Sequence, residues 1–479
     1  MPEKKTRPSV NGQEAVRRRG ILLAVGIALL CGVFIVLPTP AGLSEAGMRV
    51  MGVAALAILL WSTEALPMGV TSVLVIILLV ISGGVSGFRE ALIGFAQPVP
   101  YFLIGVLTIG LAVSKSGLAE RLARFLLGRC GGRPRTLYLQ LLLAFPLLTL
   151  MLPSATTRTG ILIHVYEEAL TLGGVQRGAP LGKAIMMALS SINRIASTML
   201  LTGGITPIVA SALVGGISWS RWLVLMGLPY SVLLATGGGL IYGLYRRGFG
   251  ARLPGVPPAA SVRLSRVELR TTIIIMGTSA LWLTDGLHHL HPALPALFAW
   301  MCLLAPGIGV ITWRDFEQDL GWATFFVLAA SLSLAQALID SGAGSWIASL
   351  VVRSTPALKQ HPLLAVVVLL VAATLIRLLI PTIAGFLAIT IPVAMLIGTT
   401  LGLNPVVCGL LVMIAGDAVL YYPAQSASSL VVYEHGHLSA PEIFRFGLAM
   451  TLATYLVVLG FALPFWGAVG EPLLMRPRP

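Results

Sequence analysis

Long apolar runs dominate the sequence between Gly20 and Trp466. They are roughly 17 to 25 residues long, the length that an α-helix needs to cross the hydrocarbon of a bilayer. Their residues do not alternate between apolar and polar, as those of membrane β-barrel strands do. The pattern therefore predicts an all-α polytopic membrane protein. The run from Gly20 to Leu37 is expected to be a retained first helix, because no signal-peptide cleavage site follows it.

Polar segments divide the chain into five expected parts. They are a basic N-terminus (1–19), a first helix with a first repeat (20–245), a basic linker (246–270), a second repeat (271–470) and a C-terminal tail (471–479). Basic loops of membrane proteins favour the cytoplasmic side. The N-terminus and the linker are therefore both predicted to lie in the cytoplasm.

Three pairs of segments recur in the two halves in the same order. Ser154 corresponds to Thr382, and the two are 382 minus 154, or 228, residues apart. Gly117 corresponds to Gly342 at 225 residues, and Ser218 to Ser439 at 221 residues. Each half has an odd number of crossings, so the repeats are expected to have opposite orientations, as in many secondary transporters. Such transporters bind their substrate near the bilayer midplane, at broken helices.

The composition fits the bilayer and argues against two classes of partner. Hydrophobic residues make up 57% of the chain and charged residues 10%. The protein is therefore expected to lie in a lipid bilayer, and a bacterial inner (plasma) membrane is its expected location. The formal charge of +14 lies largely in loops next to the apolar runs, so it reports topology and no nucleic-acid partner is expected. The four cysteines are scattered without metal-binding spacing, and no cofactor or metal is expected.

The breaks at Ser154 and Thr382 carry the first candidate site. Hydroxyls and helix N-terminal amides suit an anion, although in membrane bundles such hydroxyls often bond only to helix carbonyls. The candidate substrate-binding residues of these breaks are Ser154, Ala155, Thr156, Thr157, Arg158, Thr382, Ile383 and Ala384.

Three arginines lie in or beside otherwise apolar segments: Arg158, Arg194 and Arg377. An arginine at that depth costs at least about 2.5 kcal/mol unless it is paired or hydrated. A guanidinium binds carboxylate or sulfate through two hydrogen bonds and stays charged, so an arginine at a midplane cavity favours anionic cargo. Snorkelling to the headgroups is the alternative. Arg158 and Arg377 are candidate cargo contacts, and the polar neighbours of Arg194 suggest an interfacial turn.

Asp417 is the most isolated acid of the chain. It either pairs with a buried arginine, such as Arg194, or binds a proton that is coupled to transport; pairing is the favoured interpretation. Gly203, Thr206 and Ser426 mark a second break in each half, where freed backbone groups can complete an ion site or merely form a kink.

A second group of polar residues combines Asp285 with His288, His289 and His291. Its composition resembles that of a metal site. The group precedes Pro292 at an expected helix end, however, so an interfacial loop is the better interpretation.

Several segments, taken in order, resemble the divalent anion/sodium symporter family, whose members move dicarboxylates, citrate or sulfate. The segments are Trp61-Ser62-Thr63-Glu64-Ala65-Leu66-Pro67 with Val70-Thr71, Gly321-Trp322 leading to Gly342, and Ile217-Ser218-Trp219 with Trp222 and Gly227-Leu228-Pro229. The resemblance implies about eleven transmembrane helices plus two re-entrant hairpins in inverted-topology repeats. It also implies a homodimer and an elevator-like movement.

The family places a Ser-Asn-Thr triplet at each hairpin tip, where it contacts substrate and helps to hold sodium. Here the corresponding positions read Ser154-Ala155-Thr156 and Thr382-Ile383-Ala384, so both asparagines are absent. The departure implies sodium sites that are weakened, rebuilt or lost. Arg158 would bring a fixed positive charge to the place of a cation.

The sequence thus predicts a secondary carrier of small anions (dicarboxylate, citrate or sulfate-like) and not an enzyme. The coupling ion is left open between sodium, a proton and none, with exchange of anions as one possibility. A different anionic metabolite or a metalloid oxyanion is an alternative cargo. An intramembrane enzyme is a remote alternative, since Asp417 is the one acid expected at depth. The expected partners are the anion, the lipid bilayer and a second copy of the chain.

Overall fold

The protein is all-helical throughout the part that its computed structural model describes, which is residue 26 and residues 38–128, 131–250, 253, 264–380 and 382–475. These ranges contain no β-strand and only one isolated bridge, between Leu403 and Leu474. The predicted fold class is confirmed. The basic N-terminus, nearly all of the expected first helix and about half of the linker lie outside the described residues.

Eight of the described helical segments are long and apolar enough to cross a membrane. They are α2 (Glu45–Thr63), α5 (Pro98–Ser116), α7 (Pro134–Met151), α12 (Trp219–Leu244), α17 (Trp322–Asp340), α19 (Pro362–Leu379), α20 (Ile383–Leu401) and the segment Ala440–Ala468. That last segment joins α23 (Ala440–Val457), the π-helical turn η5 (Val458–Ala462) and α24 (Leu463–Ala468). Shorter apolar helices are α3 (Met68–Ile81), α15 (Ala293–Leu304) and α21 (Pro405–Asp417).

The segment Trp61–Pro67 is a helix boundary. Ser44 caps the start of α2 by accepting a hydrogen bond from the amide of Gly47, and α2 ends at Glu64, which has the left-handed conformation (φ 49°). Pro67 then stands immediately before α3, where its missing amide hydrogen costs nothing. Trp61 is buried against the neighbouring helices and anchors the corner.

The two halves repeat the same order of helices. After α5 come α6 (Leu118–Leu127), α7, α8 (Ala155–Leu172), a composite of α9 (Pro180–Met187), η1 (Ala188–Ile192) and α10 (Asn193–Thr198), then α11 (Ile205–Leu213) and α12. After α17 come α18 (Ala343–Ser354), α19, α20, α21, α22 (Ala427–Glu434) and α23. Gly117 and Gly342 both adopt positive φ at the equivalent corner before α6 and α18. The helix order therefore follows the sequence repeat.

The remaining described elements lie between these helices, and all of them except α13 are short. They are α4 (Phe88–Ala91), α13 (Arg266–Leu283), α14 (Asp285–His288), α16 (Trp313–Asp319) and the 3₁₀ turns η2 (Arg246–Phe249), η3 (Pro356–Lys359) and η4 (Pro423–Gln425).

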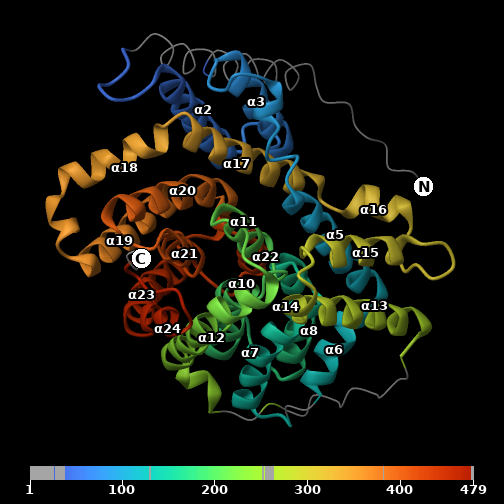
Figure 1. Ribbon diagram of the computed structural model, residues 1–479. Helices are drawn as coiled ribbons and strands as arrows, with labels where there is room; N and C mark the ends of the chain where they lie inside the picture. Colours follow the sequence, from blue (N-terminus) through green and yellow to red (C-terminus); the bar gives the residue numbers. More distant parts are fainter. Residues whose placement is uncertain are drawn as a thin grey trace, which may run out of the picture.

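The helices form two hydrophobic clusters. The smaller one joins α2 and α3 to α17, and these three helices lie together along one edge of the molecule in Figure 1. The larger one takes residues from α5 to α13, from α15 and from α18 to α24. Between the two clusters, α11 packs against α5, α17 and α20. The broken helices therefore lie where the two clusters meet.

Candidate functional site

A cavity of about 460 Å³ lies where all four breaks of the two repeats converge. Its lining comes from the α7–α8 and α19–α20 corners, from the α10–α11 and α21–α22 breaks, and from α2, α3, α5 and α17 on the opposite side. Its polar and charged lining residues are Glu64, Ser154, Thr156, Arg194, Ser197, Thr198, Thr206, Thr324, Thr382, Asp417, Gln425 and Ser426. The fold thus gathers four segments that are far apart in the sequence into one site.

Four helices begin at this cavity. Their first residues, Ala155 of α8, Ile205 of α11, Ile383 of α20 and Ala427 of α22, all line it. The first amides of a helix have no partner inside the helix, and the helix dipole makes that end positive. A cavity that receives four such ends is suited to a negatively charged ligand.

The hydroxyls at the two equivalent corners differ in their bonding. The Ser154 side-chain oxygen caps α8 by accepting from the amide of Thr157 (3.2 Å) and from its hydroxyl (3.0 Å). The Ser154 hydroxyl hydrogen therefore remains available for a ligand. The Thr382 hydroxyl oxygen is buried and has no hydrogen-bond partner among the described residues. Both hydroxyls line the cavity, so each can donate a hydrogen bond to an anion.

Arg158 is fully buried behind the wall of the cavity and does not line it. Its guanidinium donates to the carbonyl oxygen of Leu152 (2.5 Å), to the side-chain oxygen of Asn193 (2.9 Å), to the Asn193 carbonyl (3.2 Å) and to the Ser197 hydroxyl. Asn193 in turn donates to the carbonyl of Ala155 (2.9 Å). The arginine thereby ties the end of α7, the start of α8 and α10 together.

Arg377 has the equivalent role in the second half, and it too is fully buried. Its guanidinium donates to the carbonyl oxygens of Ile380 (2.5 Å), Gly416 (3.1 Å) and Gln425 (3.3 Å). Ile380 occupies the same position in the second repeat as Leu152 does in the first. Both guanidiniums therefore bind the carbonyl at the end of the helix that precedes the corner. Arg158 follows that carbonyl in the sequence, whereas Arg377 precedes it.

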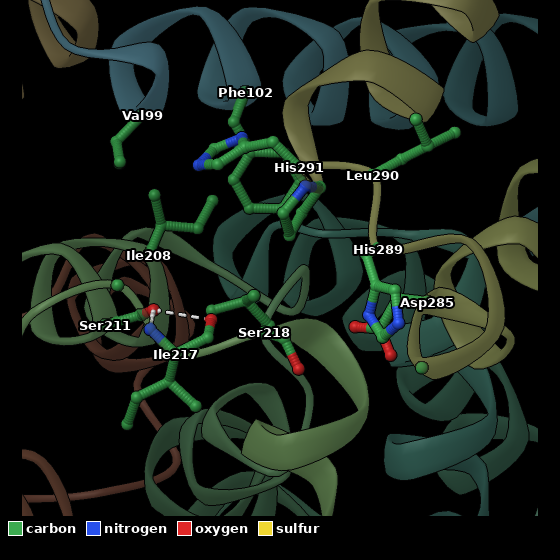
Figure 2. A pocket seen from close by; sticks show the side chains of 14 residues that line it. Val99, Phe102, Ile208, Ser211, Ile217, Ser218, Asp285, His289, Leu290 and His291 are labelled. Atoms are coloured by element: carbon green, nitrogen blue, oxygen red, sulfur yellow. Dashed lines mark hydrogen bonds between the residues drawn. The ribbon is translucent and has the colours of Figure 1, made fainter.

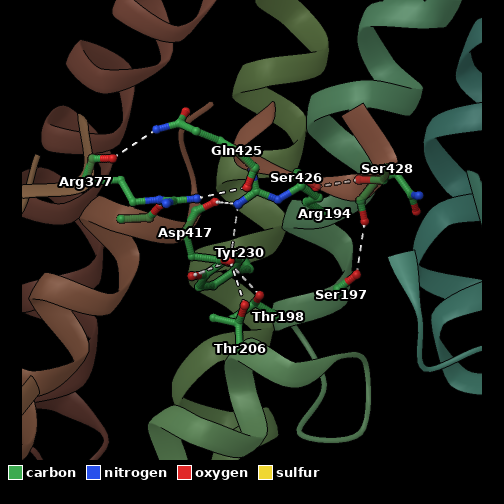
Figure 3. Close-up of polar contacts among 12 residues, drawn as sticks. Arg194, Ser197, Thr198, Thr206, Tyr230, Arg377, Asp417, Gln425, Ser426 and Ser428 are labelled. Carbon is green, nitrogen blue, oxygen red and sulfur yellow. Dashed lines mark hydrogen bonds and ion pairs between the residues drawn. The ribbon is translucent and has the colours of Figure 1, made fainter. Parts of the chain in front are cut away.

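Arg194 and Asp417 meet at the cavity wall, as Figure 3 shows. The Arg194 guanidinium donates to the Asp417 carbonyl oxygen (2.8 Å) and lies 3.5 Å from its carboxylate. That carboxylate also accepts hydrogen bonds from the hydroxyls of Thr198 (2.6 Å), Thr206 (3.0 Å) and Tyr230 (3.2 Å). Both charged side chains are buried, and the pair links α10 to α21. Arg194 thus lies inside a helix and not in an interfacial turn.

The structure brings ten of the candidate residues together at the cavity: Ser154, Ala155, Thr156, Arg194, Thr206, Thr382, Ile383, Ala384, Asp417 and Ser426. Four others do not line it: Thr157, Arg158, Gly203 and Arg377. Sequence reasoning did not single out Asn193, Thr198 or Gln425. Asn193 stands beside Arg194 in the sequence, and that proximity of an amide to an intramembrane charge is the signal that could have found it.

A second cavity, of about 310 Å³, is lined by Asp285 and by residues of α5, α11 and the turn after α11 (Figure 2). The Asp285 carboxylate accepts a hydrogen bond from the amide of Ser220 (3.0 Å) and so helps to cap α12. Burial raises the pKa of Asp285, but the hydrogen-bonding groups of Ser218, Trp219 and Ser220 together outweigh it and hold that pKa below its ordinary value. His289 and His291 line the same cavity, yet the described residues hold no cluster of three or more His, Cys, Asp or Glu suited to a metal. Asp285 thus acts as a cap of α12.

Comparison with known proteins assigns this arrangement to a family. Residues 18–471 match the family described as the sodium:sulfate symporter transmembrane region. The chain is 25% identical to a membrane protein of Cupriavidus necator over 94% of this chain and 92% of the relative. It is 24% identical to a citrate/succinate antiporter of Escherichia coli K12, over 76% of this chain and 77% of the relative.

A solved structure shares the fold. The YdaH transporter of Alcanivorax borkumensis, which has an unusual topology, matches with a TM-score of 0.56 at 15% identity, covering 90% of this chain and all (100%) of that one. The family match spans nearly the whole chain, the helices are those of a multi-pass membrane protein, and the matched relatives include anion carriers. The chain therefore belongs to the sodium:sulfate symporter family and is a secondary anion transporter, not an enzyme.

Proposed function

We propose that this protein exchanges small dianions, dicarboxylates or sulfate, across the bacterial inner membrane without a sodium requirement, through the cavity at the four breaks. The convergence of four helix N-termini carries this proposal. Arg194 supplies a guanidinium at the wall, and the hydroxyls of Ser154 and Thr382 supply donors at the two corners. Two separated donor groups match an anion with an acidic group at each end, or the oxygens of sulfate.

The two buried arginines behind the cavity wall, Arg158 and Arg377, support transport that does not need sodium. In transporters with broken helices, the carbonyls at half-helix C-termini are the groups that hold a sodium ion. The corresponding carbonyls here belong to Leu152 and Ile380, and each already accepts a hydrogen bond from a buried guanidinium. A permanent charge that is part of the chain needs no cation from solution. Unlike a bound sodium ion, this charge remains on the carrier after the anion dissociates.

The related antiporter supports exchange as the mode of transport. That relative is a citrate/succinate antiporter, a carrier that moves one anion against another. An empty site with fixed positive charges is costly to bury, whereas a site filled with an anion is compensated. Exchange follows when the carrier crosses the membrane only in the compensated form.

The family resemblance completes the proposal. The α7–α8 and α19–α20 pairs act as re-entrant hairpins in two oppositely oriented repeats, and they move with α9 to α12 and α21 to α24 against the other helices in an elevator-like step. The N-terminus lies in the cytoplasm, and two copies of the chain form the working unit. The smaller hydrophobic cluster, to which α2, α3 and α17 contribute, supports grouping these three helices in the part that stays in place.

Uptake of labelled succinate and sulfate into proteoliposomes tests the function. We expect uptake only into vesicles that are loaded with unlabelled dianion, with the same rate in sodium and in choline medium. Empty vesicles with a sodium gradient or a pH gradient are the matched controls. Uptake that needs sodium, or uptake into empty vesicles driven by protons, would contradict the proposed mode, and transport of neither anion in any arm would contradict the cargo.

A further inference from the structure

We propose that Asp417 sets the charge of the anion that this carrier accepts, by reducing the fixed charge around the cavity to the value that a dianion neutralises. The inference rests on the proposed function, since it concerns the cargo of the same cavity. Asp417 is then a specificity-determining residue and not a proton carrier.

The fixed charges beside the cavity can be counted from the described residues. Arg158 and Arg377 are fully buried, and Arg194 is 8% and Asp417 3% exposed. Three guanidiniums and one carboxylate leave a formal charge of +2. Without the carboxylate, the charge would be +3.

Other charged groups near the site do not change this count. Glu64 lines the cavity from the end of α2, but it is exposed to solvent at a corner of the smaller hydrophobic cluster, where water screens its charge. Lys183 of α9 and Glu442 of α23 neutralise each other at 2.6 Å. Glu167 of α8 is partly exposed and lies twelve residues beyond the helix start that lines the cavity, so distance and solvent screen its charge. The buried charge beside the cavity is thus set by the four residues already counted, two at the wall and two behind it.

Because these four charges are buried, their sum affects which anion the site binds. Charges interact far more strongly in a protein interior than in water, and an uncompensated buried charge is expensive. An anion with two charges brings the site to neutrality. A monoanion leaves one positive charge uncompensated, and a trianion such as fully ionised citrate adds one negative charge in excess.

The geometry favours a permanent charge on Asp417. Its carboxylate accepts from three hydroxyls and lies beside Arg194, so its oxygens are satisfied as acceptors. Asparagine has nearly the same shape, and hydroxyls can rotate to accept from its amide. The bond from Arg194 to the backbone carbonyl of residue 417 does not involve the side chain. Asp417→Asn therefore removes the charge with little change in shape.

The test is the ratio of citrate to succinate exchange in proteoliposomes at pH 8, where citrate carries three charges. We expect wild type to prefer succinate. In Asp417→Asn the site charge rises to +3, and the ratio should shift toward citrate by about tenfold or more, because one buried charge is removed. The readout is a ratio within one variant, so a lower amount of folded protein does not affect it.

The double variant Arg194→Gln/Asp417→Asn is the decisive control. It loses one charge of each sign and returns to +2, so the preference for succinate should return. A purely structural role for the pair predicts that the double variant is at least as impaired as either single variant, with no return of selectivity. An unchanged ratio in Asp417→Asn, or no recovery in the double variant, would overturn the inference while the dianion exchange of wild type still stands. A wild type that exchanges no dianion would instead contradict the proposed function.

Discussion

Arg158→Ala is expected to abolish anion exchange in sodium-free medium, with a loss of at least about 100-fold. The guanidinium donates to four oxygens, which belong to Leu152, Asn193 and Ser197. Without it, these buried acceptors lose their partners, at about 1 to 3 kcal/mol each, and the positive charge beside the cavity is lost. The corner that carries Ser154 then loses the tie that positions it.

Sodium should restore part of the activity of this variant. The oxygens left by the side chain are carbonyl, amide and hydroxyl oxygens, which suit a hard cation. Exchange by Arg158→Ala should therefore rise with sodium concentration, whereas wild type should not respond. Arg135→Ala is the matched control, because Arg135 is an exposed arginine of α7 that does not line the cavity. Wild-type rates for Arg158→Ala in choline medium would contradict the substitution of a cation by arginine.

Gly203→Ala is expected to remove nearly all transport and to lower the amount of folded protein. A Cβ atom at this position would overlap the carbonyl oxygen of Ser197 and would lie 2.6 Å from the Thr149 side chain. Backbone atoms cannot move aside as a flexible side chain can, so the α10–α11 break must shift. Ser197 also accepts from Arg158, so the shift would reach the buried guanidinium.

The neighbouring glycine provides the control for this prediction. A Cβ at Gly204 would lie 3.6 Å from the Ser197 side chain, an ordinary contact. Gly204→Ala should therefore fold like wild type, as measured by size-exclusion chromatography in detergent and by thermal unfolding. Equal behaviour of the two alanine variants would show that the break tolerates displacement, contrary to this interpretation.

The helices and the repeat could be predicted from the sequence because both follow from local patterns. Apolar runs set the helices, and the Ser154 and Thr382 segments mark the two equivalent corners at the same spacing as the start of α8 and of α20. The pairing of Asp417 with a buried arginine also followed, since an acid at depth requires a partner. These inferences need only the spacing of residue types and the cost of burying charge.

The direction of each arginine side chain could not be predicted. Arg158 and Arg377 were candidates for cargo contact, yet both turn behind the wall toward main-chain carbonyls. Their direction depends on where the chain of α10 and of α21 passes, which is a tertiary relationship between segments far apart in the sequence. Arg194, the least favoured of the three, is the one that lines the cavity.

Binding of succinate to the purified protein in sodium-free buffer, measured by isothermal titration calorimetry, tests most directly whether arginine takes the place of sodium. We predict binding in choline chloride with the same dissociation constant as in sodium chloride at equal ionic strength. Arg194→Gln, which removes the guanidinium at the cavity wall, should weaken binding in both buffers. Succinate binding that appears only when sodium is added would contradict the proposal.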